Sequence, residues 1–212
     1  AGLFTTLLLL MTLASCDSRK TAGENPFFTE WDTPHGVPPF DKILPEHFMP
    51  AFERGMSLHE AEIDAITSNK DEATFENTIL AYDDAGQMLA QTELVFGMLC
   101  AAETNDRMQA LQEQAMPLLA AHRDKIRLDD KLFVRVKEVY DRRAALGLDA
   151  EQMRLLQKTY DSFVRAGALL DAEQKARLKE INGQLSLTAV KFGNNILSLI
   201  HISEPTRPLY IS

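Results

Sequence analysis

The stretch TFENTILAYDDAGQMLAQTELVFGMLCAAET, residues 74–104, is the longest uninterrupted helical pattern in this chain. Thr74 is placed to cap the helix, because its hydroxyl can accept a hydrogen bond from the amide of Asn77. The following positions recur at steps of three and four, so they share one stripe of a helix with 3.6 residues per turn: Phe75, Ile79, Tyr82, Gly86 and Leu89. After a small shift the apolar surface continues with Leu94, Val95 and Met98. The sequence therefore predicts one long helix over residues 74–104.

Amphipathic patterns of the same period flank this stretch from residue 44 to residue 196. Pro50 is expected to break the chain before a helix over residues 51–67, and Pro117 to kink a later one. Capping residues predict the starts of the other helices: Asn105, Asp129 or Asp130, Asp149 with Gln152, and Asp171 with Gln174. The last two helices carry apolar stripes that include Leu156 and Phe163, then Leu178, Ile181, Leu185 and Phe192. Short connections between long helices favour antiparallel neighbours, so the predicted fold is an all-α antiparallel multi-helix bundle.

The composition fits a helical domain with a real core and excludes one class of partner. Of 212 residues, 45% are hydrophobic, and the formal net charge is −9. An acidic chain without a basic stripe offers no surface for phosphate groups, so no nucleic-acid partner is expected. Two cysteines are too few for a disulfide framework.

The amino terminus has the features of a targeting segment. Residues 3–13 are almost continuously apolar but too short to span a bilayer as a helix. They lead into Leu-Ala-Ser-Cys at residues 13–16, which resembles the lipobox of bacterial lipoproteins. Residues 1–16 are therefore predicted to be a lipoprotein signal peptide, with Cys16 as the lipid attachment site and membrane anchor; a buried apolar segment that happens to end in cysteine is the alternative. No Lys or Arg precedes the apolar run and the chain begins at Ala1, so we expect the start of the gene to be missing.

Residues 17–40 change character, with four prolines and two glycines that exclude a continuous helix or strand. This segment is predicted to be a tether and an extended lead-in. Its aromatic residues favour packing against the domain, with a peptide-binding platform as the alternative: Phe27, Phe28, Trp31 and Phe40.

No arrangement of residues that would perform a reaction is found in the sequence. His59-Glu60 begins like the zinc motif H-E-x-x-H, but Ile63 stands where the second histidine is required. His59 is therefore expected to be a solvent-facing side chain beside acidic neighbours. Asp83 and Asp84 are adjacent and point in different directions, so they do not form a facing carboxylate pair. If Cys16 carries lipid, Cys100 remains as a small buried hydrophobe.

Four ordered stretches carry a family resemblance: MPAFERGM at residues 49–56, FENTILA at 75–81, RRAALGLD at 142–149 and FVRAGA at 163–168. In sequence and spacing they resemble the amino-terminal region of bacterial peptidyl-dipeptidases, which are zinc metallopeptidases of the thimet oligopeptidase and oligopeptidase A superfamily. The resemblance runs from residue 25 to residue 196. It implies that residues 41–196 are the amino-terminal part of a helical, channel-type metallopeptidase that removes carboxyl-terminal dipeptides from short peptides.

In this family the zinc ligands and the catalytic glutamate lie far beyond the point where the present chain ends. No catalytic or metal-binding residue is therefore assigned in this chain, and the chain alone is expected to bind no zinc and to be inactive. Residues 197–212, which begin LSLIHISEPTR, depart from the family pattern and resemble a translated sequencing adapter, so they are predicted to be non-native. The expected location is the bacterial cell envelope, with the protein lipid-anchored and periplasmic or surface-facing. A non-enzymatic helical lipoprotein that acts as a binding or scaffold module is the alternative.

Overall fold

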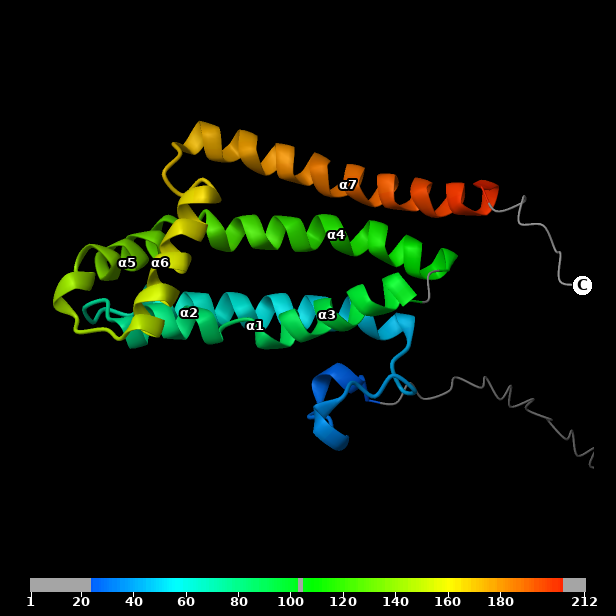
Figure 1. Cartoon of the computed structure of the whole chain (residues 1–212), viewed down its shortest axis with the longest axis horizontal. Helices are drawn as coiled ribbons and strands as arrows, with labels where there is room; N and C mark the ends of the chain where they lie inside the picture. Colours follow the sequence, from blue (N-terminus) through cyan, green and yellow to red (C-terminus); the bar gives the residue numbers. More distant parts are fainter. Residues whose placement is uncertain (1–23, 103–104, 204–212) are drawn as a thin grey trace, which may run out of the picture.

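The fold is an antiparallel arrangement of helices, as the sequence predicts (Figure 1). The computed structural model describes residues 24–102 and 105–203, with side chains described up to Ile196, and this part of the chain contains no strand. Its α-helices are α1 (Phe48–Ser68), α2 (Ala81–Asp84), α3 (Gln87–Ala102), α4 (Asp106–Arg127), α5 (Asp130–Asp141), α6 (Ala150–Arg165) and α7 (Ala172–Ser203). Short 3-10 turns lie at Pro26–Phe28, Pro34–Gly36, Pro45–His47 and Arg143–Ala145, and a π-helical turn at Phe75–Leu80.

Helix starts follow the predicted capping residues. The Thr74 hydroxyl accepts a hydrogen bond from the Asn77 amide at 3.1 Å, and the Asn77 side chain accepts one from the Thr74 amide. Asn105 caps α4 in the same way, and Asp129 caps α5. Asp149 and Asp171 each form the predicted reciprocal pair with the glutamine three residues later. These local signals fix where the helices begin because each satisfies amides that have no partner inside the helix.

The single long helix predicted over residues 74–104 is wrong. The segment begins as a π-helical turn, continues as the short α2, and is interrupted before α3. Ala85 is extended and Gly86 adopts a left-handed conformation with φ of 76°. The interruption has a tertiary cause, because Glu62 of α1 accepts a hydrogen bond from the Gly86 amide at 2.7 Å.

Two apolar cores lie along the bundle, and the chain passes from one to the other at Gly86. The first core contains the π-helical turn, the far end of α1 and the apolar faces of α5 and α6, including Phe75, Phe133 and Phe163. The second contains the start of α1, α3 and the first half of α4, with Phe48, Phe52 and Phe96 packed at centroid distances of 5.0 to 6.2 Å. Burial of each such side chain stabilises the fold by roughly 1.5–3 kcal/mol.

The lead-in packs on the second core. Phe27 is buried against Phe48, and the Trp31 ring contacts Phe27 edge-on. Arg54 of α1 lies over the Phe28 ring at 4.5 Å, so these aromatic residues pack on the domain as predicted. Phe40 is the exception, since it is exposed.

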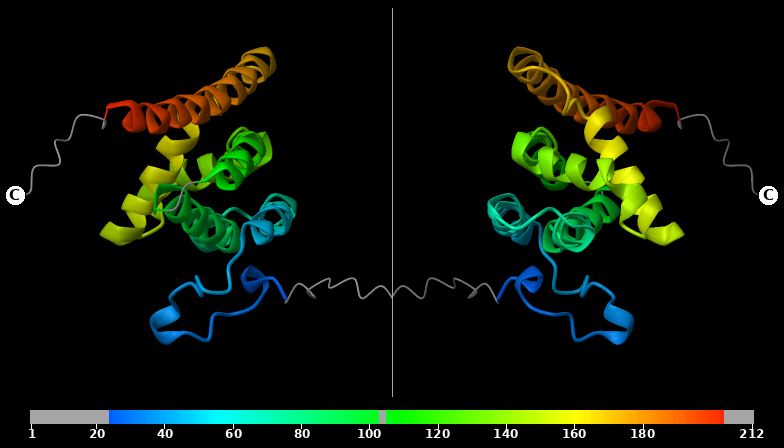
Figure 2. Two further views of the ribbon diagram at one scale, coloured as in Figure 1. Left: turned by 90° about the vertical axis from the view of Figure 1, so that its right-hand side faces the viewer. Right: turned by 90° about the vertical axis from the view of Figure 1, so that its left-hand side faces the viewer.

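Several side-chain expectations are wrong. Pro50 does not interrupt the helix. It lies in the first turn of α1, where backbone amides have no carbonyl partner inside the helix, so the missing amide hydrogen costs no hydrogen bond. Leu58, Leu94 and Met98 are exposed although they were expected on buried faces. Helix α7 packs along α4 as an outer layer (Figures 1 and 2), and its predicted core residues Ile181, Leu185 and Phe192 are exposed.

Replacement of Gly86 tests the interruption between α2 and α3. A Cβ atom at this position would lie 2.9 Å from His59 Nδ1, and the backbone has a positive φ that disfavours any other residue. We expect Gly86→Ala to lower the free energy of unfolding by about 1–3 kcal/mol, measured by urea denaturation.

Gly97 of α3 provides the matched control. A Cβ atom there meets nothing within 4 Å. Gly97→Ala should therefore be neutral or stabilise the chain by up to about 1 kcal/mol. Equal changes in the free energy of unfolding for the two variants would contradict the conclusion that the backbone at position 86 requires glycine.

Candidate functional site

Two histidines face each other between the two apolar cores. His59 of α1 and His122 of α4 lie with Nδ1 of the first 3.0 Å from Nε2 of the second, and their rings meet edge-on at a centroid distance of 5.1 Å. Along α1, His59 lies between Phe52 of one core and Ile63 of the other. The prediction that His59 faces solvent is therefore wrong, and its partner is 63 residues away in sequence.

Glu60 extends this contact toward the surface. One carboxylate oxygen lies 3.5 Å from His122 Nδ1, and the other forms an ion pair with Lys125 at 2.8 Å. His122 Nδ1 is buried and has no hydrogen bond of good geometry. The arrangement favours the His122 tautomer with its proton on Nδ1, toward Glu60, so that Nε2 accepts a hydrogen bond from His59.

Glu62 and Gly86 extend these contacts on the other side of His59. Because Glu62 holds the Gly86 amide and the His59 ring covers the Gly86 α-carbon, the interruption of the helix and the histidine pair form one unit. We name the set His59, Glu60, Glu62, Gly86 and His122 the polar layer.

The surroundings of both histidines lower their pKa values. Burial lowers the pKa of His59, and the neighbouring His122 lowers it further, against a smaller opposing effect of Glu62 and Glu60. Burial also lowers the pKa of His122, although the nearby Glu60 carboxylate partly opposes this. The Lys125 ammonium in turn keeps the pKa of Glu60 below its usual value.

The polar layer lacks the parts of a hydrolytic or metal centre. Over the described ranges, 24–102 and 105–203, no three His, Cys, Asp or Glu side chains converge to hold a metal ion. Cys100 is half-buried in α3, and burial raises the pKa of its thiol, which keeps it protonated. The polar layer joins α1, α4 and the turn at Gly86.

A buried arginine positions the turn that carries the stretch FENTILA. Arg135 of α5 is only 9% exposed and donates hydrogen bonds to the carbonyl oxygens of Asn69 and Asp71 and to the side chain of Asn77. Sequence analysis missed this residue, because nothing in the pattern of α5 separates it from a solvated arginine.

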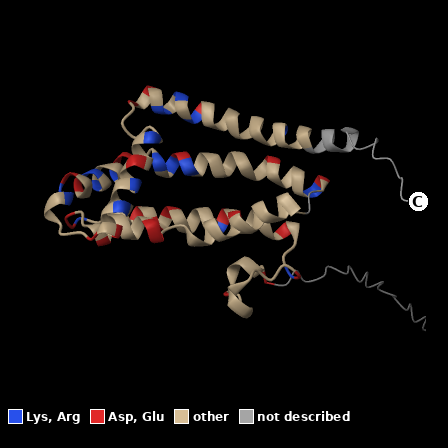
Figure 3. Cartoon of the chain, viewed as in Figure 1, with Lys and Arg blue, Asp and Glu red and all other residues tan. Residues whose placement is uncertain are grey.

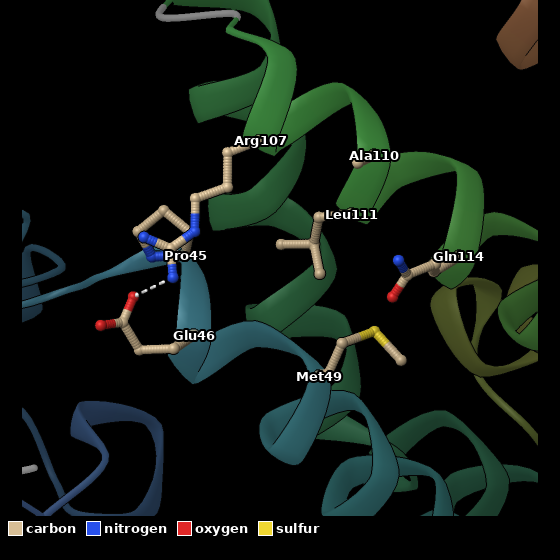
Figure 4. Close-up of a pocket in the computed structure, with 7 residues that line it drawn as sticks. All are labelled: Pro45, Glu46, Met49, Arg107, Ala110, Leu111 and Gln114. Atoms are coloured by element: carbon tan, nitrogen blue, oxygen red, sulfur yellow. Dashed lines mark hydrogen bonds and ion pairs between the residues drawn. The ribbon is translucent and has the colours of Figure 1, made fainter.

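The surface hollows lie between helices. One of about 230 Å³ lies where α1 and α4 begin, and there Arg107 and Glu46 form an ion pair at 3.1 Å above Met49 and Leu111 (Figure 4). A larger one, of about 780 Å³, lies between the lead-in and helices α1 and α3. A third, of about 400 Å³, lies between α4, the end of α6 and α7, and Arg123, Arg127 and Arg165 line it.

Two sequence predictions fall on residues outside the described part. Cys16, the predicted lipid site, precedes residue 24, and residues 204–212 of the predicted non-native tail are also outside it. Within the described residues, no helix is both long enough and apolar enough to cross a membrane.

The described residues form a helical region, and comparison with known proteins identifies its family. The dipeptidyl carboxypeptidase of Escherichia coli is 40% identical to the chain over 174 residues, which cover 82% of this chain and 26% of that protein. The protein of the same name from Salmonella typhimurium is 38% identical over the same shares. Oligopeptidase A of Escherichia coli is 24% identical over 165 residues, or 78% of this chain and 24% of that protein.

The chain belongs to the family of these peptidases, as the four sequence stretches predict. It spans about a quarter of the length of the curated relatives that it matches. No protein-family model matches the chain.

The histidine pair predicts a pH-dependent stability. Each histidine has a lower pKa in the folded chain than in the unfolded chain, so the unfolded chain binds more protons below about pH 6.5. The free energy of unfolding should therefore fall as the pH is lowered from 7.5 to 5.5. The measurement is the midpoint temperature of thermal unfolding, which should decrease over this range. The double variant His59→Gln, His122→Gln should show a smaller loss over this range, and equal slopes for the two proteins would rule out the pair as the cause.

Proposed function

We propose that this chain forms the amino-terminal helical part of a lipid-anchored zinc peptidyl-dipeptidase, an enzyme that removes dipeptides from the carboxyl ends of peptides. The observation that carries the proposal is the 40% identity over 174 residues to a dipeptidyl carboxypeptidase four times as long as the match. The all-α fold supports it, because the resemblance implies a helical wall around a peptide channel.

Zinc belongs to another part of the longer protein in this proposal. Among the described residues no group of three His, Cys, Asp or Glu side chains could hold a metal ion, and the ring nitrogens of His59 and His122 lie against each other. The chemistry that zinc supplies when bound is the activation of a water molecule for peptide hydrolysis. No catalytic step is assigned to the residues of this chain.

The role of this region is positional. The polar layer lies between two apolar cores, and α7 carries exposed apolar residues. A wall of this kind excludes folded proteins from a channel and admits short or unfolded peptides.

Peptidase assays on two proteins test the proposed activity. The chain alone should release no dipeptide from a blocked tetrapeptide, whereas the longer gene product should release the carboxyl-terminal dipeptide and lose this activity with a zinc chelator. Zinc-dependent turnover by the chain alone, or a longer gene product without an H-E-x-x-H sequence, would overturn the proposal.

The lipid anchor is tested separately. When the full-length gene is expressed in a bacterium fed an alkyne-labelled fatty acid, we expect the protein to be labelled and the Cys16→Ser variant to be unlabelled. Cys100→Ser is the matched control and should retain the label, because its thiol lies in α3. A labelled Cys16→Ser variant, or an unlabelled wild-type protein, would exclude Cys16 as the anchor.

A further inference from the structure

Three arginines converge on one hollow although the chain as a whole is acidic. Arg123 and Arg127 follow each other one turn apart on α4, and Arg165 ends α6 beside them. Figure 3 shows basic residues, with acidic residues among them, where α4 meets α6. The hollow has a volume of about 400 Å³, near the lower end of the range for small-molecule sites.

None of the three guanidinium groups has a carboxylate partner within the part of the chain that the structure describes. Arg123 donates to the carbonyl oxygen of Leu119, and Arg127 reaches the hydroxyl of Tyr82. The Asp124 carboxylate also lines the hollow, where it accepts a hydrogen bond from Asn182 of α7. Like charges four residues apart on a helix repel each other, so this grouping costs stability unless an anion offsets it.

The hollow also has an apolar side. Four aliphatic residues of α4 and α7 line it, beside the polar residues Asp124, Asn182 and Ser186: Ala120, Leu178, Leu185 and Ala189. Basic residues in the last turn of a helix are common because they complement its dipole, and this accounts for Arg127 and Arg165 singly. It does not account for three guanidinium groups around one hollow with an apolar lining. A bare inorganic anion would use only the charges, whereas a carboxylate attached to an apolar side chain would use both features.

We propose that the hollow between α4, α6 and α7, named here the arginine hollow, binds the carboxyl terminus of a peptide whose last side chain is apolar. The carboxylate would accept paired hydrogen bonds from the guanidinium groups, and the side chain would lie on Leu178 and Leu185. The site is non-catalytic. Only the choice of a peptide as the carrier of the carboxylate rests on the proposed function.

Calorimetric titration of the full chain with two hexapeptides tests the proposal. Both end in Leu; one has a free carboxylate and the other a carboxamide. We expect the free acid to bind at least about tenfold more tightly, because the amide cannot form charge-assisted bonds. Arg127→Gln and Arg165→Gln should each weaken binding of the acid by about tenfold, and Leu185→Ser should weaken it for a peptide that ends in Leu but not in Gly.

Arg177→Gln is the matched control, because Arg177 is exposed on α7, pairs with Glu180 and does not line the hollow. It should bind as the wild type does. Equal binding of acid and amide, wild-type binding by the Arg127 and Arg165 variants, or equally tight binding of inorganic phosphate would overturn the proposal. These measurements need no turnover, so loss of the proposed peptidase activity in the longer protein would leave their result unchanged.

Discussion

The Gly86 amide donates to Glu62 while the His59 ring covers the Gly86 α-carbon, and this contact holds the chain where it passes from one core to the other. Before it, Phe75 and Ile79 belong to the core with α5 and α6; after it, Leu89 belongs to the core with α4. Helices α1 and α4 contribute to both cores without interruption, whereas the segment from Phe75 to Leu89 changes direction between them. The left-handed residue supplies the change of direction.

The two cores provide most of the stability of the fold, and the polar layer fixes the position of α1 relative to α4. Each buried Leu or Phe stabilises the chain by roughly 1.5–3 kcal/mol, whereas a hydrogen bond within the layer adds about 1 kcal/mol net. Stability therefore comes mainly from the cores. The layer fixes how α1 and α4 lie along each other, because sliding either helix by a turn would separate His59 from His122 and leave buried nitrogen atoms without partners.

What the sequence could predict is local, and what it missed depends on contacts between distant residues. The helix starts at Thr74, Asn105 and Asp149 follow from side chains within three residues, so capping chemistry identifies them. The interruption at Gly86 depends on Glu62, 24 residues earlier, and the setting of His59 depends on His122. Neither partner can be identified from periodicity, which gives the faces of a helix and not their neighbours. The family could be predicted because four stretches match it in order and spacing, and this match does not depend on contacts between distant residues.

Helix α7 is a second case in which the sequence pattern did not predict the contacts of a helix. Its apolar stripe was predicted to be core, yet Leu185 and Phe192 are 63% and 65% exposed. An amphipathic pattern indicates that a helix has an apolar face, but it does not identify the segment that packs against this face. Exposed apolar residues on α7 form a surface that no described residue covers. The arginine hollow lies at the inner edge of this surface and shares Leu185 with it. Charged and apolar side chains thus meet where α7 lies along α4.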